Sequence, residues 1–495
     1  MKKAIQQILS GNILSKALGL LREVLMSKYF GTGEINGGYR IAQSGTLVPI
    51  NFMTSDSLNS AFIPLYKKYL LEDQNKANTF KWCMFFIFLM ISMLIFCILF
   101  FYSPFWVSIL APGIDEKTKI ISVSLLKIMA VCCPFYLCSA LMNYVSMAHD
   151  DFKPMSMRNP VQNVGMLLGA VTAYYFDKYE LLAWGFTGSY IYFFVWSLLR
   201  KNSDVILARP KKLVAVDIRL VLNDFWKVLR PLLLLPIILQ GNITLERALS
   251  SLVGLDAISS LDYAKFITET VIFFLSVPIA FAGLSAWSGL TSEDIKEKLS
   301  KIYTLLVILG MSVSFFLMCY SKSIVIVLFQ RGAFDTTSVE MTSSYLQGMS
   351  IGLWAQVIGY IFIKALSAQL RNKQVLIVMI LSLFGNAIVN IITYKSFGAF
   401  GIGLGCSAYG LFLLLTSAFF LGLHKNLHSS VLKMAAGIII YGIFYKIYGS
   451  VSHSAFEVVN LFVNSIVFFC FFVIWIFSFK ELRFSFLNLF NKKKA

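Results

Sequence analysis

Long apolar runs, each of about 20 residues and separated by short polar segments, are the feature that most constrains this 495-residue chain. An apolar run of this length spans the hydrocarbon core of a bilayer as a single helix. Hydrophobic residues make up 58% and charged residues 14% of the chain, against about 45–50% and about 25% in soluble domains. These figures exclude a soluble or disordered protein and indicate a polytopic membrane protein. The clearest runs cover residues 81–102, 119–148, 161–176, 181–199, 228–253, 302–329, 374–394, 400–423, 431–448 and 456–479.

Four further segments are less apolar and carry charges: residues 5–30, 38–68, 261–290 and 343–368. A charged side chain at membrane depth has to face a cavity or a partner, so these segments are the candidates for function. Counting them, we predict an all-α polytopic membrane protein with fourteen transmembrane helices. The basic opening of the chain lacks a small-residue cleavage site, so we expect its first segment to be a retained helix.

The distribution of basic residues predicts the orientation. With the N-terminus in the cytoplasm and fourteen alternating helices, 26 Lys and Arg fall in cytoplasmic segments and 5 in outer loops. This bias follows the positive-inside rule, so we expect both termini in the cytoplasm and the 103–118 loop outside. The formal net charge of +18 is dispersed over the loops without a basic domain, which argues against a nucleic-acid partner and favours anionic lipids or an anionic ligand.

A weak internal repeat suggests two related halves. Asp115 and Asp335 each follow a similar apolar segment, and residues 151–153 and 371–373 show the same offset of about 220 residues. Six helices per half is an even number, so the halves are parallel, related by an axis along the membrane normal. We therefore predict an N-terminal six-helix half over 1–200, a cytoplasmic linker over 201–226, a C-terminal six-helix half over 227–425, and two extra helices with a basic tail over 426–495.

Basic residues in the charged segments form the candidate binding site. A cavity that they line would bind a phosphate-bearing lipid headgroup, because Arg offers bidentate contacts and Lys a mobile charge. Lys16 and Arg22 are six positions apart, and Gly11 and Gly19 would permit the bend that brings both into one cavity. The alternative is a set of intramembrane ion pairs, for instance Arg22 with Glu23 or Glu246 with Lys265. The candidate residues are Lys16, Arg22, Arg40, Arg247, Lys265 and Lys364.

An uncharged polar cluster is a second candidate. Asn386 and Asn390 are four residues apart and share a helix face. With Glu246 they could hold a small cation such as sodium, whereas the alternative is hydrogen bonding between helices. We expect no bound cofactor, with coupling to Na⁺ or H⁺ as an option. Catalytic motifs are absent from the sequence, so we expect a transporter and not an enzyme.

Seven motifs of the sequence point to one family: Ser15–Glu23, Phe30-Gly31, Ala61–Pro64, Leu110–Gly113, Glu246–Ser250, Ile258–Ala264 and Leu328–Asp335. Together they resemble the MurJ/MviN family of lipid II flippases, within the multidrug/oligosaccharidyl-lipid/polysaccharide exporter superfamily. The resemblance runs over roughly residues 5–425, and the two extra helices also fit. It implies that the chain flips an undecaprenyl-pyrophosphate-linked saccharide from the inner to the outer leaflet of the bacterial cytoplasmic membrane by alternating access, as a monomer among membrane lipids.

Only some residues of this chain match the functional positions of the family, so alternatives stay open. Lys16 and Arg22 match basic cavity positions, and Glu246, Asn386 and Asn390 resemble sodium-coordinating positions of some members. The stretch Leu47–Met53 lacks the usual Arg pair, and Gly37 stands where the family usually has Asp. A flippase for O-antigen, capsule or exopolysaccharide units therefore remains an alternative, as does a multidrug exporter of the same fold, although an exporter of cationic drugs would favour an acidic cavity.

Overall fold

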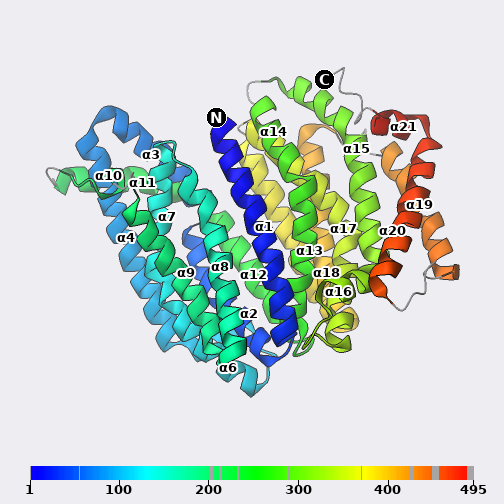
Figure 1. Cartoon of the computed structure of the whole chain (residues 1–495). Helices are drawn as coiled ribbons and strands as arrows, with labels where there is room; N and C mark the ends of the chain where they lie inside the picture. The colour runs from blue at the N-terminus through cyan, green and yellow to red at the C-terminus, as the bar shows by residue number, and fades with distance from the viewer. Residues whose placement is uncertain are drawn as a thin grey trace. The chain divides into compact units, whose positions relative to one another are not determined.

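Helices form all the regular secondary structure of the residues that this computed structural model describes, which confirms the predicted all-α class (Figure 1). Those residues are 2–54, 56–200, 204–210, 215–230, 233–287, 290–369, 371–423, 428–448 and 456–487. Lys201, Lys211, Lys212, Lys425 and Lys492–Lys494, which contribute to the predicted charge bias, lie outside them.

The helices fall into two compact units. The first unit comprises Met1–Ser259 together with Arg331–Phe334. Its helices are α1 (Lys2–Phe30), α2 (Glu34–Met53), α3 (Asp56–Glu72), α4 (Gln74–Phe101), α5 (Ser103–Leu110), α6 (Glu116–Ala130), α7 (Cys132–Ala148), α8 (Lys153–Phe176), α9 (Glu180–Leu199), α10 (Asp204–Leu207), α11 (Ala215–Leu229) and α12 (Leu234–Ser251). Within this unit α1 packs on α8, α8 on α9, α2 on α6 and α4 on α7.

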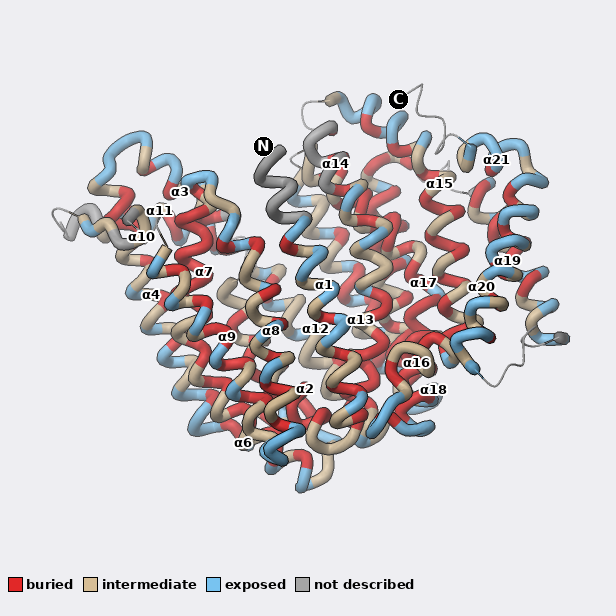
Figure 2. Tube along the Cα trace, viewed as in Figure 1, coloured by how far each residue is buried: buried red, intermediate tan, exposed pale blue. Residues whose placement is uncertain are grey.

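The second unit comprises Ser260–Gln330 together with Asp335–Ala495. Helix α17 is its centre, because α14, α15, α16 and α18 all pack on it, and Figure 2 shows long buried stretches along it. The helices are α13 (Ala257–Leu275), which starts just before the boundary, α14 (Val277–Trp287), α15 (Ser292–Cys319), α16 (Ser321–Phe329), α17 (Thr336–Ala368), α18 (Asn372–Leu421), α19 (His428–Tyr448), α20 (Glu457–Phe477) and α21 (Lys480–Leu487).

Seven helices of the described residues are long and apolar enough to cross a membrane, and nine spans result if each of two bent pairs counts as one. The chain is therefore a multi-pass membrane protein. The exact number of fourteen spans stays a prediction, because several expected spans are broken into shorter helices. The expected span over 38–68, for example, consists of α2 and α3, and the expected linker over 201–226 contains α10 and most of α11.

A proline explains one of the breaks. The expected span over 119–148 is the pair α6 and α7, bent by 45° around Val131. Pro134 lies in the first turn of α7, where its ring cannot accommodate the carbonyl of Ala130 and its nitrogen has no hydrogen to donate. The run of apolar residues continues through this point, so hydropathy alone merges the two helices.

The repeated segments adopt matching local structures in the two units. Tyr102 ends α4 with φ −107° and ψ 22°, and Tyr320 ends α15 with φ −107° and ψ 20°. After the following short helices, Asp115 caps α6 by accepting from the Thr118 N–H at 3.2 Å, and Asp335 caps α17 by accepting from the Ser338 N–H at 2.8 Å. The shared offset in sequence therefore corresponds to the same helix ends and caps.

The cap residues make a prediction about stability. Hydrogen bonds from Ser338 hold the pKa of Asp335 below its usual value, so its stabilising effect is complete at neutral pH and is lost as pH falls through that lowered pKa. Asp335→Ala should lower the free energy of unfolding at pH 7 by about 1 kcal/mol. Asp335→Asn, which still caps, should keep most of that stability and remove its dependence on acid pH. Thermal unfolding in detergent from pH 3 to 7 measures both, and equal stability of the Ala and Asn variants at pH 7 would contradict the role of the cap.

Candidate functional site

Two glycines of the first unit permit conformations that a side chain would hinder, one in the turn after α1 and one where α1 packs on α8. Gly31 adopts φ +56° in the turn that joins α1 to α2, a conformation that favours glycine. A Cβ on Gly11 would overlap the backbone carbonyl of Ser156 on α8. Gly11 therefore permits close packing of two helices, and α1 continues through it and through Gly19 as one helix from Lys2 to Phe30.

The segment Arg331–Phe334 contacts the C-terminal end of α1. Its Ala333 N–H donates to the Lys28 carbonyl at 2.9 Å, and Gly332 adopts φ +57° where a side chain would overlap that carbonyl. Thr32, in the turn after α1, donates to Asp256 at 2.8 Å. These contacts fix the direction in which α1 enters α2, and they account for the glycine in the Leu328–Asp335 motif.

The buried carboxylate of Glu23 binds two arginines. The Arg22 Nη2 lies 2.5 Å from Glu23 Oε1, and the Arg22 Nε donates to the same oxygen at 3.2 Å. From α2, the Arg40 Nη1 donates to Glu23 Oε1 at 3.2 Å, and its Nη2 pairs with Oε2. The Glu23 and Arg40 side chains are 2% and 5% exposed, whereas Arg22 is 16% exposed. These three side chains by themselves carry two positive charges and one negative charge, and Arg22 is the more exposed of the two arginines.

Neutral side chains accept further hydrogen bonds from these arginines. Asn36 accepts from Arg40 Nε at 3.2 Å and donates to the Gly31 carbonyl at 2.5 Å. Asn163, on α8, accepts from Arg22 Nη1 at 2.8 Å and donates at 3.1 Å to both the carbonyl and the hydroxyl of Ser15. The network therefore ties α1 to α2 and α8, and it orients both guanidinium groups, as buried charges require.

The other basic candidates are distributed over both units. Lys16 lies half-buried on α1, and Arg247 lies half-buried on α12 next to the buried Glu246. Lys265, on α13, and Lys364, on α17, are half-buried in the second unit, with the Lys364 ammonium 5.5 Å from the centre of the Tyr360 ring. The structure thus brings Arg22 and Arg40 together on Glu23, and the convergence of the remaining candidates stays a prediction.

The two asparagines of the predicted cation site contact each other within α18. The Asn390 Nδ2 donates to Asn386 Oδ1 at 2.8 Å, and both side chains are buried. The Asn390 Oδ1 is buried against the backbone of Gly405 and has no hydrogen-bond partner among the described residues. Nearby, Ser407 donates to the Gly348 carbonyl on α17 at 2.6 Å. Ser407 thus connects two helices, whereas Asn390 offers an oxygen that a cation could bind.

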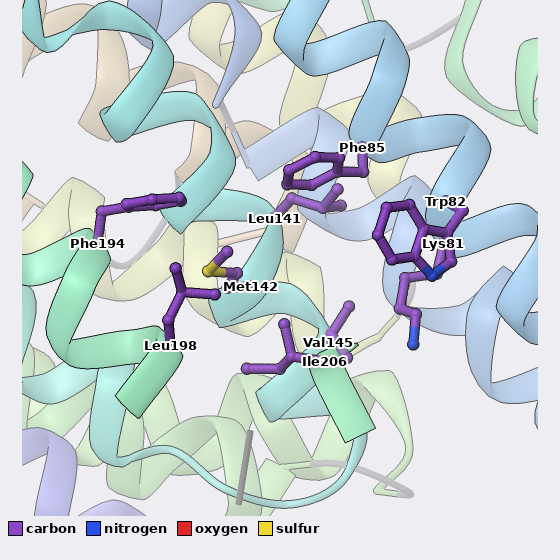
Figure 3. A pocket seen from close by; sticks show the side chains of 9 residues that line it. All are labelled: Lys81, Trp82, Phe85, Leu141, Met142, Val145, Phe194, Leu198 and Ile206. Atoms are coloured by element: carbon purple, nitrogen blue, oxygen red, sulfur yellow. The ribbon is translucent and has the colours of Figure 1, made fainter. Parts of the chain in front are cut away.

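A separate cavity of about 150 Å³ in the first unit has a different character (Figure 3). It is lined almost entirely by apolar side chains from α4, α7, α9 and α10, with Lys81 at its edge. The charge count assigns Lys81 to a cytoplasmic loop, but it lies inside α4, is 3% exposed and donates to the Val205 carbonyl at 2.6 Å. Trp82 donates to the Ala208 carbonyl at 2.9 Å. These two residues hold the segment that contains α10, and the cavity is no site for an anion.

Comparisons with known proteins place this chain in a family. The family profile "Lipid II flippase MurJ" matches residues 26–485. A probable lipid II flippase MurJ of Buchnera aphidicola subsp. Schizaphis graminum is 25% identical over 411 residues, which is 80% of this chain and 78% of that protein. The corresponding Thermotoga maritima protein is 22% identical over 401 residues, 80% of each chain.

Solved structures show the same fold. A structure titled "Lipid II flippase MurJ, inward closed conformation" matches with a TM-score of 0.81 at 19% identity, over 95% of this chain and 99% of that one. An inward-facing multidrug transporter of the MATE family matches with a TM-score of 0.64 at 13% identity, over 84% and 96%. At these identities the structural matches support the fold only.

The shared carboxylate makes a prediction about stability. Glu23→Gln would remove the buried carboxylate that binds both Arg22 and Arg40, so it should lower the free energy of unfolding by about 3–5 kcal/mol. Glu34→Gln is the matched control, because Glu34 pairs with Lys117 at 2.6 Å at an exposed site and should change stability by less than about 1 kcal/mol. Chemical unfolding followed by tryptophan fluorescence measures both. Equal stabilities of the two variants would show that the Glu23 network does not support the fold.

Proposed function

Because this chain belongs to the MurJ family of lipid II flippases, we propose that it moves lipid II, an undecaprenyl-pyrophosphate-linked saccharide, from the inner to the outer leaflet of the bacterial cytoplasmic membrane. Alternating access would carry the headgroup across while the prenyl tail stays in lipid. The observation that supports this most is the net positive charge that Arg22, Arg40 and Glu23 hold within the membrane-spanning first unit. The chain would work as a monomer with both termini in the cytoplasm.

The arginine pair suits a pyrophosphate. Arg22 uses its Nε and both terminal nitrogens in the network, and its Nη1 also contacts the Met166 sulfur at 3.0 Å. A guanidinium group carries five N–H donors, so these four contacts leave one donor for a phosphate oxygen. Glu23 neutralises one of the two cations and so limits the attraction of the arginine pair for the pyrophosphate. The anion would then bind firmly enough to enter the site and weakly enough to leave it. A multidrug exporter of cations would need the opposite sign of charge, so the excess of arginine opposes that alternative.

The membrane potential would assist this movement. An inside-negative potential favours outward transfer of an anion by about 2.3 kcal/mol per charge per 100 mV. Flipping should therefore slow when the potential is collapsed, if the headgroup crosses with uncompensated negative charge.

Variants of α1 test the proposed function. Arg22→Ala and Lys16→Ala should each weaken binding of the anionic headgroup as it crosses by about 1.5–3 kcal/mol. This corresponds to roughly a 10- to 150-fold loss of flipping rate. Lys28→Ala is the matched control, because Lys28 lies exposed at the end of the same helix. The measurement is lipid II flipping in vesicles by protein that inserts normally. Wild-type rates in both Arg22→Ala and Lys16→Ala would refute the cationic site.

We propose further that a sodium ion couples to this movement, with Asn390 as one ligand. The support is the buried Asn390 Oδ1, whose neighbour Asn386 already accepts the Asn390 amide hydrogen. Sodium at ten times its Kd should then stabilise the protein by about 1.4 kcal/mol.

The Asn390→Ala variant should lose this stabilisation, whereas Asn464→Ala, which removes another buried asparagine on α20, should keep it. The measurement compares melting in sodium with melting in a bulky organic cation at equal ionic strength. If sodium shifts the melting of neither wild-type protein nor the Asn464→Ala variant, Asn386 and Asn390 have only a structural role within α18, and proton coupling remains.

A further inference from the structure

The short C-terminal helix α21 presents one face that is both basic and apolar. Lys480, Arg483, Phe484 and Leu487 follow the spacing i, i+3, i+4 and i+7, so they share a face, and all four are exposed. Phe484 in particular is 67% exposed. Leu482 on another face is fully buried. The helix is thus fixed by one side and leaves a mixed cationic and aromatic side uncovered.

Polar contacts to α19 fix the orientation of this face. Glu481 accepts from the hydroxyls of Ser429 and Ser430, each at 3.1 Å, and pairs with Lys433. The Trp475 Nε1 on α20 donates to the Lys433 carbonyl at 2.9 Å. These contacts join α19, α20 and α21, and Figure 1 shows α21 at the end of that helix pair. Lys433 is neutralised by Glu481, whereas neither Lys480 nor Arg483 has an ion-pair partner among the described residues.

The position of α21 matches the surface of a membrane. Only Ser478 and Phe479 separate it from α20, which is long and apolar enough to span the bilayer. A helix that starts directly after a span lies at the level of the lipid headgroups, where exposed aromatic rings and basic side chains are stable together. The basic residues of this segment also favour the cytoplasmic side, where the leaflet carries anionic lipids.

A hollow of about 590 Å³ lies against this face. Lys433, Lys480 and Arg483 contribute its cationic lining, and Phe479, Phe484 and Leu487 contribute its apolar lining. Glu481 also lines it, and this carboxylate pairs with Lys433. Its size is in the range of small-molecule sites. The unpaired cations fit a phosphodiester, and the neighbouring rings fit the glycerol backbone and the first methylenes of an acyl chain. A free phosphate would leave the apolar lining exposed to water.

We propose that α21 forms a binding site for an anionic phospholipid of the inner leaflet, with Lys480 and Arg483 on the phosphate and Phe484 against the acyl chains. This site lies apart from the charged network of the first unit and does not depend on the proposed flipping activity. Because Glu481 connects α21 to α19 and Trp475 connects α20 to α19, a lipid bound at α21 would help hold the cytoplasmic ends of α19 and α20 together.

The experiment measures binding of phosphatidylglycerol, and of phosphatidylcholine with the same acyl chains, to the purified full chain in detergent by native mass spectrometry without lipid II. The variant Lys480→Gln with Arg483→Gln should lower the affinity for phosphatidylglycerol about 25-fold, roughly fivefold for each charge, and leave phosphatidylcholine binding unchanged. The matched control, Lys298→Gln with Lys373→Gln, removes two exposed cations elsewhere in the same unit and should bind as wild type does.

Two outcomes would overturn the proposal. Wild-type affinity in the Lys480→Gln, Arg483→Gln variant would show that α21 holds no such lipid, and an equal loss in the control variant would show attraction to overall charge instead of a site. Phe484→Ser distinguishes the source of the phosphate. It should weaken phosphatidylglycerol binding severalfold, whereas tight binding of glycerol 3-phosphate to the wild-type protein would contradict a lipid site. Melting temperatures without added lipid confirm that each variant is folded.

Discussion

The carboxylate of Glu23 is the interaction on which the polar interior of the first unit depends. Burying three charges among membrane helices is costly unless they are paired and hydrogen-bonded. Here Glu23 binds Arg22 from its own helix and Arg40 from the next helix, while Asn36 and Asn163 occupy further guanidinium donors. The same carboxylate stabilises the buried arginines and would also set how strongly the network attracts the anion that we propose it binds.

The sequence was sufficient for the class of protein and for part of this site. Apolar runs and dispersed basic residues predicted an all-α membrane protein, and the adjacency of Arg22 and Glu23 suggested an ion pair. It could not show that Arg40 shares the carboxylate, because that depends on the turn at Gly31, which folds α2 back along α1. Asn163 was missed for a similar reason, since it reaches Arg22 from a helix 141 positions away. An asparagine at the start of an apolar run was the available signal.

Helix boundaries were less predictable than helix identity. Hydropathy continues across Val131, whereas the backbone bends there because Pro134 cannot complete the preceding turn. The spacing of Asp115 and Asp335 was more informative, because a carboxylate before a helix has a definite structural role as a cap. Prolines and capping residues therefore mark helix ends that the prediction from hydropathy merged, and long-range pairs such as Glu23 with Arg40 required the structure.

The central claim is that the net charge of the Glu23 network governs binding of the pyrophosphate. The most direct test compares lipid II affinity in wild-type protein, in Arg22→Ala, and in Arg22→Ala combined with Glu23→Gln. Removing Arg22 alone leaves a neutral pair, whereas removing Glu23 as well leaves Arg40 as a single cation and restores the original net charge. We expect weak binding in the single variant and substantial recovery in the double variant. Binding in the double variant as weak as in the single variant would contradict the central claim.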